Sequence, residues 1–270
     1  MTYTHVLYHA KCTDGFGAAW AAWRKLKGAA KYVPIHHGDP FPALPTNADV
    51  IMLDAAYPRP RHEELTALVR SLTVVDHHKT NLETIGKLPN VHIDMSHSGA
   101  TLAWLFFHPS EPIPELLKYV EDYDLWRFNL PHSLEIHAAI DSYPYDFEVW
   151  SGLEQKIGTE RFRTDGEAIL RYQKSVVEEA CKNVFWMTMA GHRIPVVNAT
   201  ELTSEIGNML CKLHPEAPFS AYYFEKESIR CWGLRSIGDF DVENVARIYG
   251  GGGHRNASGF TEPMERKRVW

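Results

Sequence analysis

The stretch Val74-Val75-Asp76-His77-His78-Lys79 leads from two apolar β-branched residues directly into an acid and two adjacent imidazoles. Such a run predicts a buried β-strand that ends in side chains able to hold a metal ion. An acid and two histidines are weak evidence by themselves. The interpretation therefore depends on whether other predicted strands end in the same chemistry.

Other strands do end in this way. Short apolar strands are predicted at residues 5–8, 31–37, 49–54, 72–76 and 91–94. The first runs into a polar loop that carries His9, Cys12 and Asp14, and the third ends at Asp54. Because the carboxyl ends of parallel strands meet at one edge of a sheet, these side chains are expected to converge.

Helical patterns fill the intervals between these strands and predict an α/β fold with a parallel sheet. These helices are predicted at residues 15–27, 61–71, 98–108, 114–124 and 144–157. Later elements are predicted as strands at residues 185–190, 193–198, 219–224 and 229–234 and as helices at 202–214 and 241–249. The predicted domains are a metal-binding catalytic domain (1–157), a long linker helix (158–184) and a smaller mixed α/β substrate-binding domain (185–270).

The composition is that of a soluble globular protein, with 270 residues, 44% hydrophobic and 23% charged. A net charge of −6 argues against a broad basic surface for long duplex nucleic acid, but it does not exclude a local anion pocket. No apolar stretch approaches the roughly 20 residues that span a bilayer, and no secretory signal is expected. The four cysteines lack close pairing, so reduced thiols and a cytoplasmic location are expected.

The predicted strand ends supply mixed imidazole and carboxylate ligands for a metal. The candidates are His9, Asp14, Asp54, Asp76, His77, His78 and the helix-borne Asp124. Such ligands suit manganese, iron, zinc or magnesium, and a pair of cations about 3.5–4 Å apart would suit phosphate-ester hydrolysis. Each residue alone has a plain structural alternative: the two histidines could be solvated, and Asp54 could cap a helix. The recurrence at several strand ends favours the metal site.

A run of glycines at residues 250–253 is the second functional candidate, because backbone N–H groups without neighbouring Cβ atoms can approach an anion closely. The candidate substrate-binding residues are Gly251, Gly252, Gly253, His254, Arg255, Asn256, Arg235 and Ser236. The alternative for the glycine run is a flexible surface loop, and the alternative for Arg235 is plain solvation.

These motifs resemble the DHH phosphoesterase family with its C-terminal DHH-associated domain. The matching segments, in order, are residues 9–19, Leu53-Asp54, Asp76-His77-His78, Asp122-Tyr123-Asp124 and Gly251-Gly252-Gly253-His254. The resemblance implies a parallel α/β domain joined by a helix to a smaller mixed α/β domain, with the active site in the cleft between them. It also implies manganese bound by Asp14, Asp54, His77 and Asp124, with Asp54 bridging.

The resemblance also implies roles for neighbouring residues. His78 would face the phosphate, Asp76 would orient an imidazole, and His254 would hold a substrate phosphate or terminal nucleotide. Family members usually carry two aspartates in the first motif, whereas this chain has Cys12 in place of one. His9 and Asp14 are hypothesised to be ligands, and Cys12 is either an optional ligand or a packing residue.

The function expected from these features is hydrolysis of short single-stranded oligonucleotides or dinucleotides to nucleoside monophosphates, with manganese as the cofactor and magnesium, iron or zinc as alternatives. A phosphomonoesterase acting on a small nucleotide such as 3′-phosphoadenosine 5′-phosphate, or pyrophosphate hydrolysis, is a second possibility. A non-catalytic nucleotide sensor is a third, motivated by the missing aspartate. Trp126 and Phe128 could stack on a base, although core packing is the simpler role. No membrane partner is expected, and the oligomeric state stays open.

Overall fold

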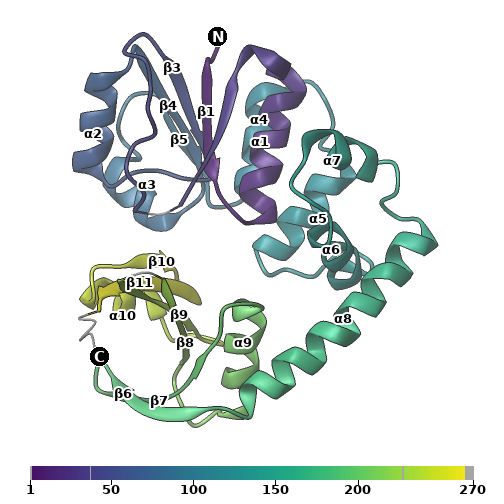
Figure 1. Cartoon of the computed structure of the whole chain (residues 1–270), viewed down its shortest axis with the longest axis vertical. Helices are drawn as coiled ribbons and strands as arrows, with labels where there is room; N and C mark the ends of the chain where they lie inside the picture. The colour runs from purple at the N-terminus through teal and green to yellow at the C-terminus, as the bar shows by residue number, and fades with distance from the viewer. Residues whose placement is uncertain (1, 37, 227, 265–270) are drawn as a thin grey trace, which may run out of the picture. The chain divides into compact units, whose positions relative to one another are not determined.

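The computed structural model describes residues 2–36, 38–226 and 228–264, and it divides into two compact units, residues 1–170 and 171–270 (Figure 1). The first contains a parallel sheet and the second a separate mixed sheet, which confirms the predicted α/β class. The predicted domain boundaries at residues 157/158 and 184/185 stay predictions. No helix among the described residues is long and apolar enough to cross a membrane.

The sheet of the first unit has five strands in the order β2-β1-β3-β4-β5, and each neighbouring pair is parallel. The strands are β1 (His5–His9), β2 (Lys31–Ile35), β3 (Asp49–Leu53), β4 (Ser71–Asp76) and β5 (Val91–Ile93). Leu53 pairs with Tyr8 on one side and with Val75 on the other. The carboxyl ends of β1, β3 and β4 therefore lie level with one another. The predicted second strand ends at Ile35, and its last predicted residue, 37, lies outside the described residues.

Helices cover both faces of this sheet (Figure 1). The helices that contact the strands are α1 (Thr13–Leu26), α2 (Arg59–Leu68), α3 (Lys79–Ile85) and α4 (Gly99–Phe107). Helices α5 (Glu115–Asp124) and α7 (Phe147–Leu153) and the 3-10 turn η1 (Lys27–Ala29) pack against α1, and α6 (Ser133–Asp141) packs against α5. Ile51 and Leu53 pack with Trp20 of α1 in one apolar cluster. The alternate residue Met52 packs with Leu65 of α2 in another. Burial of both faces explains why the strands read as continuous apolar runs.

Several helices differ from the sequence prediction. α2 begins at Arg59, two residues earlier than predicted, because Pro60 in the first turn lacks only an N–H that would have no intrahelical partner there. The predicted helix at 144–157 is limited to Phe147–Leu153, with Asp146 capping its first turn through Glu148 N and Val149 N. The short helices α3 and α6 were not predicted, since neither presents a long apolar stripe.

Among its described residues, the second unit contains a six-stranded mixed sheet in the order β10-β11-β9-β8-β7-β6, in which β7 and β8 pair in parallel and the other neighbours pair antiparallel. Its strands are β6 (Phe185–Met189), β7 (His192–Asn198), β8 (Ser220–Lys226), β9 (Ile229–Arg235), β10 (Gly252–His254) and β11 (Ala257–Pro263). The helices are α9 (Thr203–Leu213) and α10 (Val242–Ile248), and α8 (Glu160–Cys181) runs through the division of the chain.

The glycine run forms an edge strand. Residues 252–254 make β10, which pairs antiparallel with β11, whereas the sequence predicted only a bent anion-binding backbone. A Cβ on Gly251 would lie 2.0 Å from the carbonyl oxygen of Gly259, and Gly253 has a φ of +142°. These two positions therefore require glycine, the first for space and the second for its backbone conformation.

Candidate metal centre

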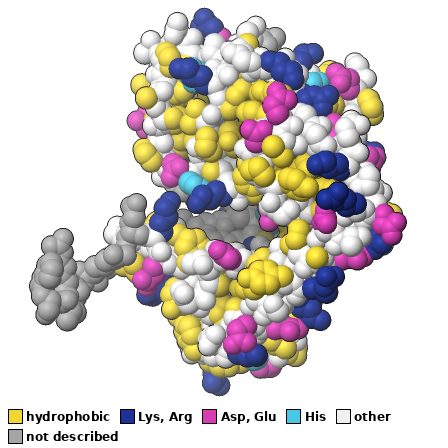
Figure 2. All heavy atoms as spheres, turned by 45° about the vertical axis from the view of Figure 1, so that its right-hand side comes forward, with side chains coloured by type: hydrophobic (Ala, Val, Ile, Leu, Met, Phe, Trp, Pro, Cys, Tyr) yellow, Lys and Arg dark blue, Asp and Glu magenta, His cyan; other side chains and the backbone are white. Residues whose placement is uncertain are grey.

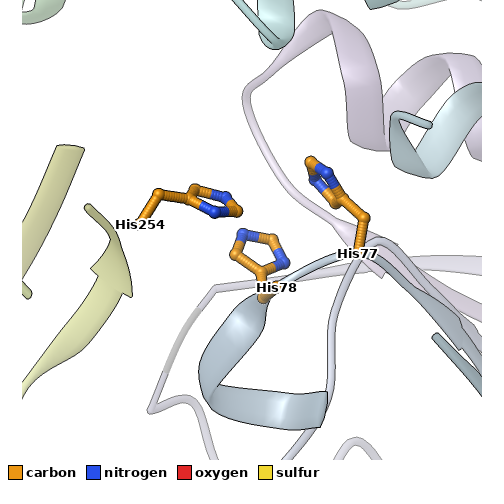
Figure 3. A group of neighbouring side chains, drawn as sticks. All are labelled: His77, His78 and His254. Carbon is orange, nitrogen blue, oxygen red and sulfur yellow. The ribbon is translucent and has the colours of Figure 1, made fainter. Parts of the chain in front are cut away.

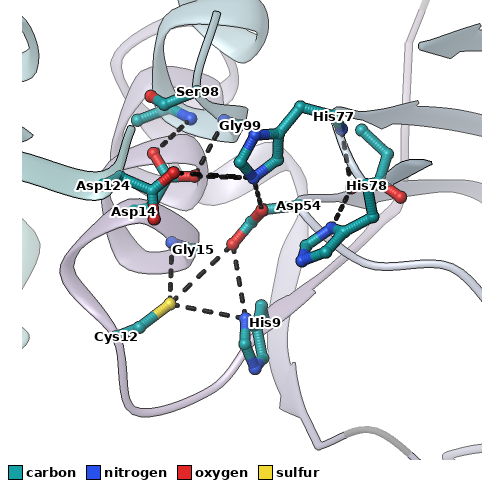
Figure 4. A network of polar contacts seen from close by, with 12 residues as sticks. His9, Cys12, Asp14, Gly15, Asp54, His77, His78, Ser98, Gly99 and Asp124 are labelled. Carbon is teal, nitrogen blue, oxygen red and sulfur yellow. Dashed lines mark hydrogen bonds and ion pairs between the residues drawn. The ribbon is translucent and has the colours of Figure 1, made fainter. Parts of the chain in front are cut away.

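The predicted metal-binding side chains of the first unit lie together at the carboxyl ends of its parallel strands (Figure 4). They come from separate elements: His9 ends β1, Cys12 and Asp14 flank the start of α1, Asp54 follows β3, Asp76 to His78 follow β4, and Asp124 ends α5. The level ends of β1, β3 and β4 account for their convergence.

Asp54 lies at the middle of this group. Its Oδ1 is 3.2 Å from Nε2 of His77, and its Oδ2 is 3.4 Å from Nδ1 of His9. The side chain is only 2% exposed, and the backbone adopts a left-handed φ of 52°. Aspartate tolerates this conformation better than most residues. The backbone N–H of Asp54 donates to the carbonyl oxygen of Val75 at 3.0 Å, which anchors the turn to β4.

His9 and Cys12 lie on one side of Asp54. The Cys12 Sγ atom is 3.5 Å from Nδ1 of His9 and 3.8 Å from Oδ2 of Asp54. Cys12 is also the N-cap of α1, where its sulfur accepts a hydrogen bond from the N–H of Gly15 at 3.2 Å. The three side chains each offer one ligand atom, and these atoms lie within 4.8 Å of one another.

Asp14, His77 and Asp124 form the other side, again with ligand atoms within 4.8 Å of one another. Nε2 of His77 lies 3.6 Å from Oδ2 of Asp14 and 3.7 Å from Oδ2 of Asp124. Asp14 accepts hydrogen bonds from the N–H groups of Gly99 at 2.8 Å and Ala100 at 2.9 Å. Those groups open α4, so its N-terminal dipole stabilises the carboxylate and fixes its direction.

Asp76 orients His78. Its Oδ1 lies 2.8 Å from Nδ1 of His78 and also accepts the N–H of His77 at 2.8 Å. The amide Nδ2 of Asn81 donates to Oδ2 at 2.5 Å. Asp76 is completely buried, so these contacts hold the imidazole of His78 and the backbone of His77 in fixed positions. One ligand atom each from Asp54, Asp76 and His78 also lies within 4.8 Å of the others.

The electrostatics of the group reflect buried charges held close together. Burial, followed by the charges of Asp124 and Asp54, raises the pKa of Asp14 well above its usual value. The pKa of Asp124, whose side chain is 31% exposed, is raised as well, by partial loss of solvation and by the charge of Asp54. Burial alone would raise the pKa of Asp54, but the hydrogen bonds and charges of His77 and His9 hold it well below its usual value. The concentration of acids favours a bound cation, which would relieve their mutual repulsion.

Burial and the neighbouring acids act in opposite directions on the pKa values of the histidines, and the acids have the larger effect. Burial lowers the pKa of His77, but the hydrogen bond and charge of Asp54 outweigh burial and raise it to about 10. The pKa of His9 is raised to about 11 by Asp54 and Cys12 against the same effect of burial. Burial raises the pKa of the Cys12 thiol to about 11. A cation binding these groups must therefore displace protons.

The donor set fits divalent cations. Carboxylate oxygens and imidazole nitrogens are the ligands of manganese, magnesium, iron and zinc, and Asp54 directs one oxygen toward each side of the group. These residues could thus hold two cations that share Asp54.

Several residues that build the site were not predicted from the sequence. A Cβ on Gly99 would lie 2.5 Å from Cβ of Asp54, so glycine permits α4 to approach this side chain. The Nε2 atom of His137 lies 3.0 Å from Oγ1 of Thr13, and its ring stacks on Tyr123 at 3.4 Å between centroids. His137 thereby joins the segments that precede Asp14 and Asp124. For Gly99, the sequence offered one signal: Ser98 is an N-cap residue before an apolar helix, which marks Gly99 as the first residue of that helix.

Figure 3 shows the imidazoles of His77 and His78, which follow β4, and that of His254, which ends β10. Within the second unit, the candidate substrate-binding residues form hydrogen bonds with several different side chains. Nδ2 of Asn256 donates to Oγ of Ser236 at 2.8 Å, so the structure brings these two together. The guanidinium of Arg255 binds the side chain of Asp239 at 3.0 Å.

Arg235 lies apart from that pair. Its Nη2 donates to Oγ of Ser204 at 2.8 Å, and its Nη1 donates to the carbonyl oxygen of Leu234 at 2.9 Å. A Cβ on Gly207 would lie 2.6 Å from Cγ of Arg235, so the stem of this arginine packs closely against α9. The predicted phosphate-binding roles of these residues stay predictions.

Comparison with known proteins gives relatives of greater length. No family model matches the chain. The chain is 30% identical over 280 residues to "Uncharacterized protein R106" of Acanthamoeba polyphaga mimivirus, across 94% of this chain and 66% of that protein. It is 25% identical over 242 residues to oligoribonuclease NrnB of Bacillus subtilis (strain 168), across 78% of this chain and 58% of that protein. The chain thus spans less than two thirds of either relative.

A solved structure shares the fold. The DHH domain of a member of the s1p family of ribosomal proteins matches 99% of this chain and 84% of that chain, with a TM-score of 0.59 and 15% sequence identity. At this level of identity the likeness concerns the arrangement of strands and helices.

Proposed function

We propose that this chain, which belongs to the DHH phosphoesterase family, is a metal-dependent phosphodiesterase that cleaves short single-stranded oligonucleotides or dinucleotides to nucleoside monophosphates. The observation that carries the proposal is Asp54, a buried carboxylate with one oxygen toward His9 and Cys12 and the other toward His77. A centre shared in this way suits two cations and the hydrolysis of a phosphate ester.

In the proposed reaction, different residues of the chain bind the cations, orient His78 and contact the phosphate. When bound, divalent cations would supply positive charge to the phosphoryl oxygens and lower the pKa of water. Asp14, Asp54, His77 and Asp124, together with His9, would hold those cations. Asp76 would keep the ring of His78 in one orientation, and His78 would contact the phosphate and stabilise charge that develops on it.

The second unit would bind the rest of the substrate. We assign a phosphate or terminal nucleotide to the segment Gly251–His254, where the lack of Cβ atoms permits close approach to the backbone, and to the nearby pair Ser236 and Asn256. The roles of Arg235 and Arg255 are proposed on the positive charge of their guanidinium groups, and Arg255 would have to exchange its ion pair with Asp239 for a contact with the anion.

Short substrates are favoured over long duplexes. The net charge is −6, and on the face drawn in Figure 2 Lys and Arg side chains lie among Asp and Glu side chains. Long duplexes are usually bound by continuous basic surfaces. The relative from Bacillus subtilis is named an oligoribonuclease, which agrees with this substrate class.

An activity panel tests the proposal. The full chain is incubated with dinucleotides, longer oligomers, cyclic dinucleotides and small nucleotide monophosphates, each with manganese, magnesium, zinc or a chelator. We expect fastest turnover of dinucleotides or short oligomers with manganese and none with chelator. Release of inorganic phosphate from a small nucleotide, with no cleavage of dinucleotides, would instead establish a phosphomonoesterase.

A nucleotide sensor is the second candidate, because the first motif usually carries two aspartates in the family and Cys12 takes the place of one of them here. Its signature would be tight binding of a dinucleotide in manganese without cleavage, together with cleavage by the Cys12→Asp variant. Turnover by the unaltered chain contradicts the sensor.

A further inference from the structure

The two sides of the metal centre differ in ligand chemistry. His9, Cys12 and Asp54 offer an imidazole nitrogen, a sulfur and a carboxylate oxygen within 4.8 Å of one another. Asp14, His77 and Asp124 offer only nitrogen and oxygen. Sulfur is a soft ligand that favours zinc or iron(II), whereas carboxylates suit manganese and magnesium. The centre is therefore chemically asymmetric about Asp54.

The direction of the sulfur is set by local structure. Cys12 has an extended backbone, with φ −137° and ψ 154°, and caps a helix of 14 residues. The N–H of Gly15 donates to Sγ at 3.2 Å, so the sulfur faces the positive end of the α1 dipole. Helix N-termini stabilise thiolates. The cap thus holds Sγ in a fixed direction, 3.5 Å from Nδ1 of His9.

A second observation points to a ligand at the same place. Asp54 is buried, and its two carboxylate oxygens point in different directions. Oδ2 lies 3.4 Å from Nδ1 of His9 and 3.8 Å from Sγ of Cys12. A thiol that served only to cap the helix would need neither of these neighbours. Three different ligand types within 4.8 Å of one another could hold a cation together, whereas a capping residue alone could not.

We propose that His9, Cys12 and Asp54 form a thiolate-containing cation position that selects a thiophilic divalent ion such as zinc or iron(II), while Asp14, His77 and Asp124 take a harder ion such as manganese. The inference rests on the proposed metal-dependent function and deepens it by giving the two positions different preferences. Cys12 gives up its proton to solvent when the ion binds.

Cobalt(II) is the probe for this test, because a thiolate ligand to cobalt produces an intense charge-transfer absorption that oxygen and nitrogen ligands do not. The full chain is compared with Cys12→Ser, Cys12→Asp and the matched control Cys231→Ser, which removes a partly buried thiol from β9. Calorimetry counts the bound ions. We expect the absorption in the unaltered chain and in Cys231→Ser, and its loss in both Cys12 variants.

Metal competition gives a second readout. Cys12→Asp keeps a good helix cap and replaces sulfur by oxygen, so we expect the preference for zinc over manganese to fall by at least about tenfold. The absorption persisting in Cys12→Ser, or the unaltered chain binding two cobalt ions without it, would overturn the proposal and leave the proposed function intact. Failure to bind any divalent ion would overturn both.

Discussion

At the scale of single residues, the centre depends on Asp54 serving two neighbours at once. Its two oxygens lie 3.2 Å and 3.4 Å from nitrogens of His77 and His9. The opposite pKa shifts within the group, upward for Asp14 and downward for Asp54, follow from which acid has a histidine at hydrogen-bonding distance. The carboxylate of Asp54 thus contacts both histidines, and removal of its charge should affect cation binding at both of them.

Asp54→Asn is the sharpest change at this scale. It keeps the shape of the side chain, but it removes the charge that the two proposed cations would share, so we expect turnover to fall by at least about 10²–10³-fold and divalent-ion affinity to fall with it. Steady-state kinetics and calorimetry measure the two effects. Asp49→Asn is the matched control, because Asp49 begins the same strand and binds Arg70 and Ser71 instead. Equal losses in both variants would contradict the role of Asp54.

His254→Ala tests the second unit by kinetics. The proposed contact is to substrate that does not react, so we expect KM to rise about tenfold while kcat changes little. A fall in kcat at unchanged KM would show that His254 acts on the reacting phosphate instead.

At the scale of elements, the site requires close approach of helices to strand ends. α4 begins beside Asp54, and its first N–H groups hold Asp14. α6 reaches the same region through His137, which is bonded to Thr13 and stacked on Tyr123. Both helices position ligands that belong to other elements.

Gly99→Ala should disturb this approach. A Cβ there would lie 2.5 Å from Cβ of Asp54, so we expect a loss of about 1–3 kcal/mol in the free energy of unfolding and weaker metal binding. Urea denaturation and calorimetry report the two quantities. Gly152→Ala in α7 is the control: no atom lies within 4 Å of its added Cβ, so stability should be unchanged or rise by about 0.5–1 kcal/mol.

His137 predicts a pH dependence of stability. Burial lowers its pKa to about 3 from the usual 6.5, so the folded protein holds it neutral. Its contribution is fully present above pH 6.5 and is lost as the pH falls toward 3, by up to about 1.4 kcal/mol per pH unit. We expect the stability difference between the unaltered chain and His137→Gln to shrink across this window when measured by urea denaturation in chelator. A difference that stays constant with pH would refute the assignment.

The sequence predicted the parallel sheet and the candidate ligands because both depend on local patterns. Val74 to His78 reads as a buried strand followed by an abrupt change to polar ligands, and Asp54 follows another such strand. Gly99 and His137 escaped prediction because their importance comes from residues far away in the chain, Asp54 and Thr13. β10 escaped because its glycines have little strand preference and the strand forms by pairing with β11.

At the scale of the whole molecule, a bound cation should stabilise the folded chain. At 100 times the dissociation constant, the gain is about 2.7 kcal/mol, or several degrees in the melting temperature. We expect manganese to raise the melting temperature in calorimetry, chelator to reverse the rise, and Asp54→Asn to lack it. Because protons compete for the same ligands, the rise should diminish as the pH is lowered. A rise of equal size in Asp54→Asn would place the stabilising ion elsewhere.

The first turn of α1 ties ion release to local opening of the chain. Cys12 caps this turn, Asp14 lies within it, and the N–H of Phe16 donates to the carbonyl oxygen of Cys12 at 3.1 Å. Each of these two side chains would hold one of the two proposed ions, so unwinding of the turn would weaken both positions, and ion release and the hydrogen-exchange rate of these amides should change together. The bound metal would then keep the first turn of α1 closed, and its removal would first increase the opening of that turn.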